Sequence, residues 1–462
     1  MKNRNTQPKP LFINKENMCI ALDLYQLTMA AGYFERSKNH TSTFELFVRK
    51  LPENRSYLVA AGLEQVVYYL NNLTFTDTYI QYLKNLPLFK NVSREFFRYL
   101  RNFCFQGDLF AVPEGTIVFA NEPILRVTAP AIEAQIIETY LLSMINYQSM
   151  IASKASRVVY AAEGKEVIDF GTRRAHSPQA GILAARACFI GGCIGTSNVL
   201  TAYELGIPAI GTIAHSWIMA YDDEFTSYKD FQRVFPENTI LLIDTYDTVK
   251  GAELAVKIGK RLKGVRLDSG DISLLSRKVR KILDNAGLEQ VKITVSGDLN
   301  EYKISELLKK RAPIDSFGVG TEMVTSKDSP ALNGVYKLVE QEVDGRVIPK
   351  MKLSEDKVAY PSTKQVYRFF DKNGRFKKDT VGLADEKYDA EALLLPIIRS
   401  GKLSYTIPTV REIQKFATGN FARLPEKFKK LDCGTSYQVL FSKRLREMKE
   451  RISRNLIGFD KK

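Results

Sequence analysis

The stretch Gly264-Val-Arg-Leu-Asp-Ser-Gly-Asp271 decides the fold class that this sequence predicts. It runs from a short apolar strand, Gly264–Leu267, through a polar turn to Asp271, a residue type that caps helices. Apolar residues at helical spacing follow as far as Gly287, where the helix is predicted to end. A strand that leads directly into a helix of this length is the building unit of a parallel sheet.

The same strand–helix unit recurs on both sides of this stretch. Further strands are predicted at residues 166–170, near 193–194, and at 207–213, 239–244, 292–296 and 316–319, and further helices at 249–262 and from Asn300 onward. Six or seven such units favour a closed parallel α/β barrel over the alternative, a doubly wound open sheet. We therefore expect a barrel domain over residues 151–340.

Residues outside this span follow other patterns. Residues 1–150 combine strand-like runs at 43–48 and 117–118 with helical spacing at 57–71 and 131–151, which indicates an α+β N-terminal domain. Residues 341–462 are rich in charge and turn residues around 340–350 and 371–378, which indicates exposed hairpins and loops. We expect this C-terminal extension to pack on the barrel as an appendage.

The composition is that of an ordinary globular protein. Apolar residues make up 45% and charged residues 26% of the 462 residues, which excludes disorder and low complexity. Residues 1–10 are polar and lead into no apolar run, and no stretch approaches the roughly 18 apolar residues of a membrane span. The five cysteines include no C-x-x-C pair, so neither a disulfide framework nor a zinc ribbon is indicated. A cytoplasmic protein is the simplest interpretation.

The net charge of +15 is concentrated near the C-terminus. Residues 401–462 hold 15 Lys and Arg against 6 Asp and Glu, a difference of +9. Such a tail can bind RNA, but it lacks the interleaved aromatic residues of a base-stacking surface. A solvated helix surface is therefore the favoured interpretation, and the smaller positive excess elsewhere suits anionic substrates.

Every predicted strand of the barrel region ends in Gly, Asp, Thr, Ser or Arg. The carboxyl ends of parallel strands converge on one face, where ligands bind. One such end is usually turn chemistry, whereas seven in phase predict a functional site. The seven ends are Asp169-Phe-Gly-Thr-Arg-Arg174, Gly195-Thr-Ser-Asn198, Gly211-Thr-Ile-Ala-His-Ser216, Asp244-Thr-Tyr-Asp247, Arg266-Leu-Asp-Ser-Gly-Asp271, Ser296-Gly-Asp-Leu-Asn300 and Gly318-Val-Gly-Thr-Glu322.

These strand ends favour a phosphorylated ligand. Glycines and helix N-termini let backbone N–H groups approach phosphate, and Arg173, Arg174 and Arg266 offer paired donors. The several aspartates need a neutralising partner, and Mg²⁺ that arrives with a di- or triphosphate meets that need. The sequence has neither a G-x-x-x-x-G-K-[ST] loop nor a G-x-G-x-x-G fingerprint, which excludes a Walker-type ATPase and a dinucleotide-binding strand end.

His215 is the candidate for covalent or acid–base chemistry. It is one of three histidines, follows a predicted apolar strand and shares a face with several carboxylates. An imidazole in this setting can act as a base, or accept a phosphoryl group if a carboxylate holds its other nitrogen.

Together with two N-terminal motifs, these strand ends resemble the nicotinate phosphoribosyltransferase family. The motifs are Asp-Leu-Tyr-Gln-Leu-Thr-Met (23–29) and Phe-Val-Arg-Lys-Leu-Pro (47–52), and the match runs from about residue 20 into the C-terminal region. The resemblance implies an irregular α/β barrel enzyme of NAD biosynthesis. Such an enzyme makes nicotinate mononucleotide and pyrophosphate from nicotinate and 5-phosphoribosyl 1-pyrophosphate. The resemblance also implies coupled ATP hydrolysis, Mg²⁺ and a homodimer with shared active sites.

The resemblance assigns roles to the matching residues. His215 would take the phosphoryl group from ATP, while Asp268 and Asp244 would orient it or bind ribose and metal, roles that the sequence does not separate. The nicotinate-binding residues would be Tyr25, Phe170, Ser197, Thr212 and Arg266, with Tyr25 expected from the neighbouring subunit. The phosphate- and ribose-binding residues would be Arg49, Arg173, Gly297, Asp298, Gly320 and Thr321.

Ser197 bears on the choice of substrate. The related nicotinamide enzymes carry an aspartate at this position, and a carboxylate there would repel the carboxylate of nicotinate. Nicotinate is therefore favoured over nicotinamide, and quinolinate is disfavoured because its enzymes are usually shorter and use no ATP. A basic nucleic-acid-binding protein is a more remote alternative. For the favoured enzyme we expect no nucleic-acid partner and no membrane partner. Cys433 stands alone, which predicts no structural zinc.

Overall fold

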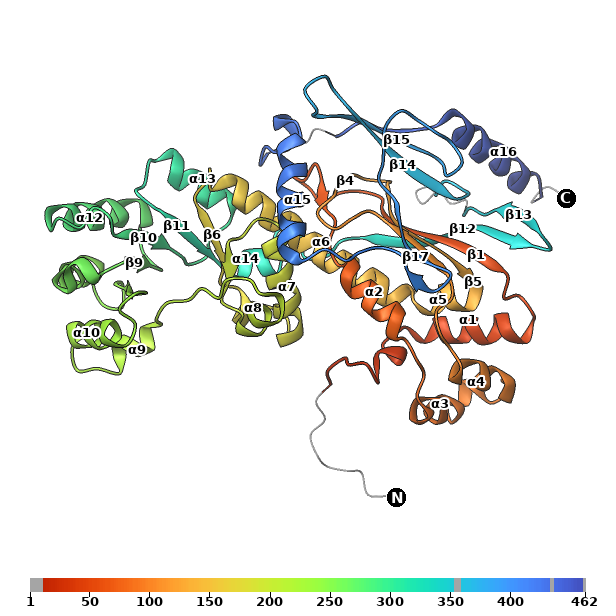
Figure 1. The fold of residues 1–462 in the computed structure, drawn as a ribbon, viewed down its shortest axis with the longest axis horizontal. Helices are drawn as coiled ribbons and strands as arrows, with labels where there is room; N and C mark the ends of the chain where they lie inside the picture. Colours follow the sequence, from red (N-terminus) through yellow and green to blue (C-terminus); the bar gives the residue numbers. More distant parts are fainter. Residues whose placement is uncertain (1–10, 353–358, 433–435, 460–462) are drawn as a thin grey trace, which may run out of the picture.

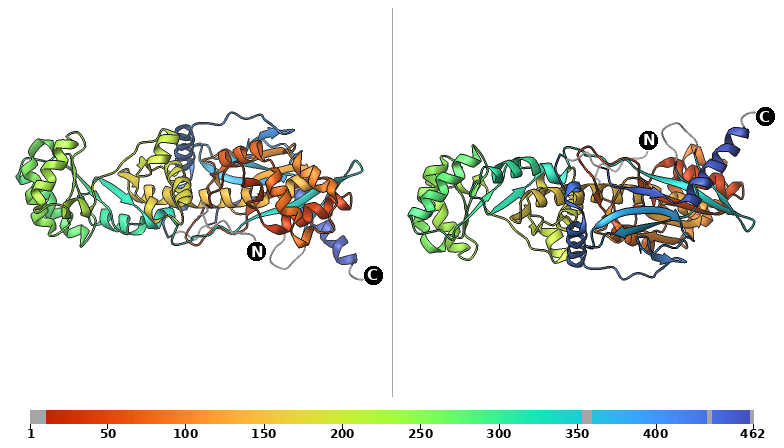
Figure 2. Two further views of the ribbon diagram at one scale, coloured as in Figure 1. Left: turned by 90° about the horizontal axis from the view of Figure 1, so that it is seen from below. Right: turned by 90° about the horizontal axis from the view of Figure 1, so that it is seen from above.

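The computed structural model describes residues 11–352, 359–432 and 436–459. Two hydrophobic cores lie at the two ends of an elongated molecule (Figure 1). One core underlies a parallel sheet with its helices, and the other underlies a large antiparallel sheet. The side views in Figure 2 show the same arrangement, with residues 200–290, in green, at one end. Residues 1–10 and Cys433, on which two predictions rest, lie outside the described residues.

Six strands form one parallel sheet in the order β7-β6-β11-β10-β9-β8. Their bounds are β6 (Glu166–Asp169), β7 (Gly195–Thr196), β8 (Ile240–Leu242), β9 (Gly264–Leu267), β10 (Lys292–Val295) and β11 (Ser316–Val319). Every neighbouring pair is parallel, which confirms the predicted parallel α/β architecture. Beyond β7, Ala209 forms an isolated parallel bridge to Thr196, and no strand pairing within the described ranges joins it to β8. The ring of strands is interrupted at this seam, which makes the barrel irregular.

The predicted strand at residues 207–213 is wrong. Only Ala209 bridges to a strand, and the flanking hydrogen bonds join Thr196 to Pro208 and Ile210. Ile207 and Ile213 are nevertheless buried in the barrel core. The apolar residues of this segment are apolar because the segment is buried as coil. A sequence pattern does not distinguish a buried coil from a buried strand.

Helices flank the parallel sheet (Figure 1). They are α7 (Pro178–Ile190), α8 (Val199–Leu205), α9 (His215–Met219), α10 (Glu224–Val234), α11 (Thr248–Ala255), α12 (Ile272–Asn285), α13 (Glu301–Lys309) and α14 (Thr321–Val324). The predicted cap at Asp271 is confirmed, because its side chain accepts from Leu274 N. The helix predicted from Asn300 is present, and the side chain of Asn300 caps it by accepting from Tyr302 N and Lys303 N. The helix predicted over 249–262 ends at Ala255. Turns of 3-10 helix continue from there to Arg261, and the non-helical backbone of Gly259 interrupts them.

The antiparallel sheet combines three separate parts of the chain, in the order β13-β12-β1-β5-β3-β17-β18. The strands are β1 (Thr41–Val48), β3 (Asp108–Ala111), β5 (Pro123–Pro130), β12 (Gly334–Val343), β13 (Arg346–Pro349), β17 (Leu395–Arg399) and β18 (Lys402–Leu403). Residues after 333 thus complete a sheet begun by the first 130 residues. The division at residues 150 and 340 stays a prediction.

Two N-terminal helices differ from their predictions. Within 57–71, Leu58–Val59 forms β2, which pairs with β4 (Ile117–Val118), and α2 (Leu63–Asn72) begins only after Gly62. Gly62 has φ of +104°, which interrupts a helix. Within 131–151 there are two helices, α5 (Ala131–Ile136) and α6 (Glu138–Ala161). The long helix α6 contacts β2, α7 and α13, so it joins the two ends of the molecule.

The remaining elements complete the two ends. They are α1 (Leu24–Glu35), α3 (Asp77–Lys84), α4 (Arg94–Arg101), β14 (Lys364–Phe370), β15 (Phe376–Leu383), β16 (Glu391–Ala392), α15 (Val410–Arg423), β19 (Val439–Phe441) and α16 (Lys443–Phe459). The strands β12 and β13 form one antiparallel hairpin, and β14 and β15 form another, as the segments around 340–350 and 371–378 predict. Within the described ranges, no helix has both the length and the apolar character needed to cross a membrane.

Candidate active site

Arg266, on β9, joins the ends of β9 and β10 and the coil at Thr212 through its guanidinium group. Its Nε donates to Ser296 Oγ at 2.8 Å, its Nη1 to Thr212 Oγ1 at 3.0 Å and its Nη2 to Asp268 Oδ1 at 2.8 Å. The guanidinium carbon also lies 5.4 Å from the centre of the Phe170 ring. A cation held by this many partners keeps its position before any ligand arrives.

Asp268 is the second centre of this network, and Asp244 supports it. Asp244 Oδ2 accepts from Asp268 N at 2.9 Å and from Ser269 Oγ at 2.7 Å. Burial raises the pKa of Asp268, but the hydrogen bond from Ser296 and the charges of Arg266 and His215 outweigh it and hold the pKa below its usual range. Asp268 is therefore an anion at neutral pH. The geometry separates the two aspartates: Asp268 lies at the ligand cavity, and Asp244 fixes the backbone behind it.

His215 begins the short helix α9, with two different neighbours at its two ring nitrogens. Nδ1 lies 3.1 Å from Thr245 Oγ1, and Nε2 lies 4.0 Å from Asp268 Oδ2. Its side chain is 41% exposed, so a ligand can reach the ring. The predicted carboxylate neighbour is present at Nε2, whereas a hydroxyl occupies the Nδ1 side.

Two adjoining cavities surround these residues. The first, of about 340 Å³, is lined by Phe170, Thr172, Arg173, Ser197, Thr212, His215, Leu242, Arg266 and Asp268, among others. The second, of about 230 Å³, is lined by Arg174, Ser296, Gly297, Asp298, Gly318, Gly320 and Thr321 and shares Phe170, Arg173, Arg266 and Asp268 with the first. The unshared lining of the first includes the apolar Ile213 and Leu242, whereas that of the second includes Arg174 and the open backbone of three glycines. This contrast suits a flat ring beside a phosphate group.

Glycine is required at Gly297 for the second cavity to exist. Its φ is +89°, and a Cβ would lie 2.0 Å from the carbonyl oxygen of Asp268. Gly318, which lines the same cavity, leaves room for the Phe170 ring, because a Cβ there would lie 2.3 Å from that ring. The strand-end glycines thus allow close packing as well as backbone access.

Asp169 organises the strand ends that carry Phe170 and Ser197. It is buried, and its carboxylate accepts from Gly171 N at 2.8 Å and from Thr196 Oγ1 at 2.7 Å. Its carbonyl oxygen accepts from Ser197 N at 2.9 Å. Burial raises the pKa of this carboxyl group, and the hydrogen bonds oppose that rise.

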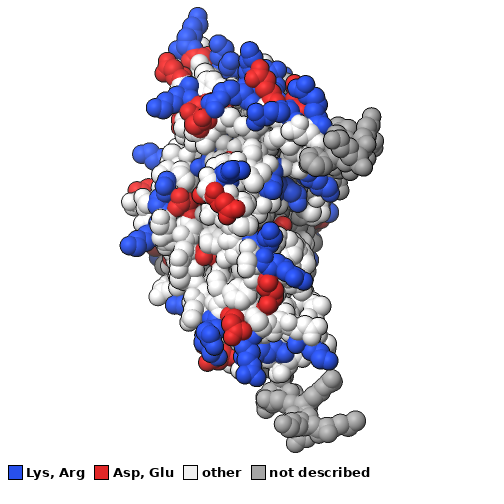
Figure 3. Space-filling view, turned by 90° about the vertical axis from the view of Figure 1, so that its right-hand side faces the viewer, with Lys and Arg blue, Asp and Glu red and all other residues white. Residues whose placement is uncertain are grey.

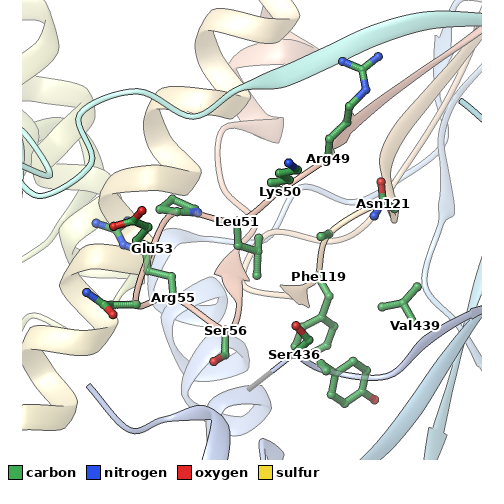
Figure 4. A pocket seen from close by; sticks show the side chains of 14 residues that line it. Arg49, Lys50, Leu51, Glu53, Arg55, Ser56, Phe119, Asn121, Ser436 and Val439 are labelled. Atoms are coloured by element: carbon green, nitrogen blue, oxygen red, sulfur yellow. The ribbon is translucent and has the colours of Figure 1, made fainter. Parts of the chain in front are cut away.

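Tyr25 and Arg49 line neither of these two cavities. Tyr25 lies on α1, is 46% exposed, and has its pKa raised to about 12 by burial and by Glu138. Arg49 follows β1 and lines a separate cavity of about 640 Å³, together with residues 50–56, Asn121 and Tyr437 (Figure 4). In one chain, the two N-terminal candidates are therefore apart from the other candidates.

Several residues at the site received no individual role from the sequence, although all but Leu242 lie within the seven predicted strand ends. They are Asp169, Thr172, Leu242, Thr245, Ser269 and Ser296. Most of them lie directly beside a candidate in the same strand end, so adjacency to a candidate is the signal that could have found them.

The basic C-terminal helix α16 belongs to the other end of the molecule. Figure 3 shows Lys and Arg side chains at the top of that face with Asp and Glu among them. Arg444 forms an ion pair with Asp385, and Lys443 Nζ lies 3.8 Å from Glu447 Oε1. This mixed surface is typical of a solvated helix.

Three family models match the chain in succession. The nicotinate phosphoribosyltransferase N-terminal domain matches residues 20–146, the nicotinate phosphoribosyltransferase family matches residues 166–380, and the nicotinate phosphoribosyltransferase C-terminal domain matches residues 386–449.

Individual relatives agree with this result. A nicotinate phosphoribosyltransferase of Mycobacterium tuberculosis is 44% identical over 92% of this chain and 91% of its own, and one of Bacillus subtilis is 37% identical over 96% and 98%. The crystal structure of human nicotinic acid phosphoribosyltransferase matches with a TM-score of 0.82 and 26% identity, covering 93% of this chain and 99% of that chain. A structure of nicotinate-nucleotide pyrophosphorylase from Pyrococcus furiosus matches with a TM-score of 0.74 and 30% identity, covering 90% and 99%.

Proposed function

The chain belongs to the nicotinate phosphoribosyltransferase family, and we propose that it transfers the phosphoribosyl group of 5-phosphoribosyl 1-pyrophosphate to nicotinate in NAD biosynthesis. The observation that carries the proposal for this chain is Arg266, held at the junction of a ring-sized cavity and a phosphate-sized cavity. Both substrates can meet there.

Nicotinate fits the first cavity by charge and by shape. Its carboxylate would pair with Arg266 and accept from Thr212, and its ring would lie against Phe170. Ser197 lines the same cavity and adds no charge. An acid is therefore favoured over an amide at this end of the site.

The phosphoribosyl substrate fits the second cavity. Arg173 and the backbone around Gly297, Gly320 and Thr321 would bind its phosphates. In the reaction, the pyridine nitrogen donates its lone pair to the ribose C1, and pyrophosphate leaves with the electrons of the C1–O bond. Positive charge develops at the ribose in between, and the carboxylates of Asp268 and Asp298 would stabilise it. The pyridine nitrogen carries no proton at neutral pH, so no general base is needed.

ATP coupling through His215 extends this proposal. The His215 side chain is partly exposed, and its Nε2 lies on the side of Asp268 and the cavity, where a phosphoryl donor can approach it. Mg²⁺ bound by substrate phosphates fits the donor set, since Asp268 is an anion at the cavity and Asp244 Oδ1 is buried with no hydrogen-bond partner among the described residues. When bound, this ion neutralises the phosphates and the leaving pyrophosphate.

A homodimer with shared sites also follows from the proposal. Tyr25, Leu24 and Met29 expose apolar surface on α1, while Val199 and Tyr203 do so on α8, beside Ser197. A two-fold dimer that places each α1 over its partner's barrel would bury both surfaces and would bring Tyr25 to the nicotinate cavity. We expect such an enzyme to work in the cytoplasm.

The decisive experiment offers the purified chain nicotinate, nicotinamide or quinolinate with 5-phosphoribosyl 1-pyrophosphate and Mg²⁺, with and without ATP. Nicotinate mononucleotide is the expected product, and ATP should raise its yield. Turnover of nicotinamide or quinolinate alone would assign the chain to a sister activity.

The same samples test the phosphohistidine. ATP labelled in the γ-phosphate should transfer acid-labile phosphate to His215, and the His215→Ala variant should acquire none. Labelling of that variant at the rate of the unaltered chain would refute the assignment to His215.

A further inference from the structure

We infer that Thr245 is a positioning residue that fixes the proton and the orientation of the His215 ring. The inference rests on the proposed phosphorylation of His215 by ATP. It concerns the side of the ring that faces away from the ligand cavity, which neither the motifs nor the family match assigned.

The geometry around His215 is asymmetric. Thr245 Oγ1 lies 3.1 Å from Nδ1, and no other side chain in the described part of the protein is within hydrogen-bond distance of that nitrogen. Nε2, at the other side of the ring, lies 4.0 Å from Asp268 Oδ2. The ring thus has one nitrogen held by a neutral hydroxyl and one nitrogen directed at the charged part of the site.

This asymmetry matters for phosphoryl transfer. The Nε2 lone pair attacks the γ-phosphorus of ATP, the N–P bond forms, and the bond to the bridging oxygen breaks so that ADP leaves with its electrons. The imidazole proton must therefore be on Nδ1, since a proton on Nε2 would occupy the attacking lone pair. In the inferred arrangement Thr245 Oγ1 accepts a hydrogen bond from Nδ1–H, which stabilises this tautomer during the attack. It also stabilises the positive charge that the ring gains as the N–P bond forms.

The residue before Thr245 is held by hydrogen bonds to the neighbouring strand end. Thr245 directly follows Asp244, whose carboxylate accepts from the backbone of Asp268 and the hydroxyl of Ser269. The same strand end therefore acts on both sides of the histidine ring. Asp244 positions Asp268, which lies near Nε2, and Thr245 contacts Nδ1. Threonine is β-branched and has fewer χ1 rotamers than serine, which keeps its hydroxyl directed at the ring.

The test compares Thr245→Val, which removes the hydroxyl at nearly constant volume, with Thr245→Ser, which retains it. The measured quantities are the rate of acid-labile phosphate transfer from γ-labelled ATP to His215, and kcat and KM for nicotinate. Thr248→Val is the matched control, because Thr248 lies one turn along the chain at the start of α11 and lines neither cavity.

Loss of one hydrogen bond to a ring that becomes charged should slow labelling by Thr245→Val about tenfold or more. The Thr245→Ser variant should recover to within about threefold of the unaltered chain, and Thr248→Val should label normally. KM for nicotinate should change little in all three variants, because Arg266 and Thr212 hold that substrate. The thermal midpoint of each variant shows that it is folded.

Three results would overturn the inference. They are normal labelling by Thr245→Val, failure of folded Thr245→Ser to recover, and an increase in KM for nicotinate as large as the loss of labelling rate. If the unaltered chain is not labelled at His215, the proposed ATP coupling fails and the inference fails with it. If the unaltered chain is labelled and Thr245→Val behaves like it, only the inference fails.

Discussion

The barrel half and the N-terminal half of the candidate site differ in how far a single chain assembles them. In the barrel half, Arg266, Asp268, Ser296 and Asp244 are joined by hydrogen bonds, and their positions are set without a ligand. In the N-terminal half, Tyr25 is half exposed, and Arg49 Nε is buried without a hydrogen-bond partner among the described residues. The barrel is therefore preorganised, whereas in the proposed dimer the N-terminal residues acquire their partners from the second subunit.

The largest expected effect comes from breaking the preorganised half. Arg266→Gln removes the charge that joins Ser296, Thr212 and Asp268, and leaves Asp268 without its cation. We expect kcat/KM for nicotinate to fall roughly a hundredfold or more, as for other truncated buried charge pairs. Steady-state kinetics measure this loss. Arg233→Gln is the control, because Arg233 is exposed on α10 and pairs with Asp230; a loss of similar size in both variants would contradict the role given to Arg266.

The second prediction tests whether the N-terminal half belongs to another chain's site. Arg49→Gln and His215→Ala should each be nearly inactive alone. If Arg49 serves the partner's barrel, mixing and reassembling the two variants creates mixed dimers with one intact site, and about a quarter of the activity should return. Activity is measured before and after mixed refolding, with each variant refolded alone as the control. No recovery in verified mixed dimers would place Arg49 and His215 in the same chain's site.

The smallest expected effect concerns the link between the two halves. Asp328 follows α14 and pairs with Arg55 at 3.0 Å and with Lys154 at 2.9 Å, and Arg55 lies in the same loop as Arg49. Burial raises the pKa of Asp328, but the two cations outweigh it and the pKa lies below its usual range. A lowered folded pKa gives stability that is present above about pH 4 and is lost as the pH falls through the folded value.

Asp328→Asn should therefore lower the free energy of unfolding by about 1–2 kcal/mol at pH 7. The difference from the unaltered chain should shrink when the pH is well below 4, because the protonated Asp328 is then as uncharged as the asparagine that replaces it. Urea unfolding at the two pH values measures it. Asp77→Asn is the matched control on the exposed surface. A difference in unfolding free energy that stays constant with pH would show that the charge of Asp328 does not stabilise the contact between the two halves.

The sequence predicted the parallel unit well because its strands are buried on both faces and end in polar residues. Reading an apolar run with a polar end as a strand failed at residues 207–213, since a buried coil gives the same apolar run. Pairing of β1 with β12 left no local signal, because register between strands so far apart in sequence depends on tertiary packing.

At the site, prediction worked for residues with distinctive chemistry and failed for supporting ones. Arg266 is a cation in a polar strand end and His215 is one of three histidines, whereas Thr245 and Ser296 look like ordinary turn residues. Their importance depends on which atom their hydroxyl reaches, and only the structure shows that. Tyr25 and Arg49 came from the resemblance alone, and one chain places neither beside the barrel cavities.

The antiparallel sheet has a consequence for how the chain is made. Strand β1 lies between β5 and β12, and Val48 pairs with Gly334. At translation speeds of 5–20 residues per second, the ribosome needs roughly 15–60 s to deliver β12 after β1. During that time one edge of β1 has no partner, although seven of its eight residues, all but Thr41, end up buried in the finished sheet. The nascent chain therefore needs protection from aggregation at this edge, and fragments that end before β12 should be recovered mainly as insoluble material.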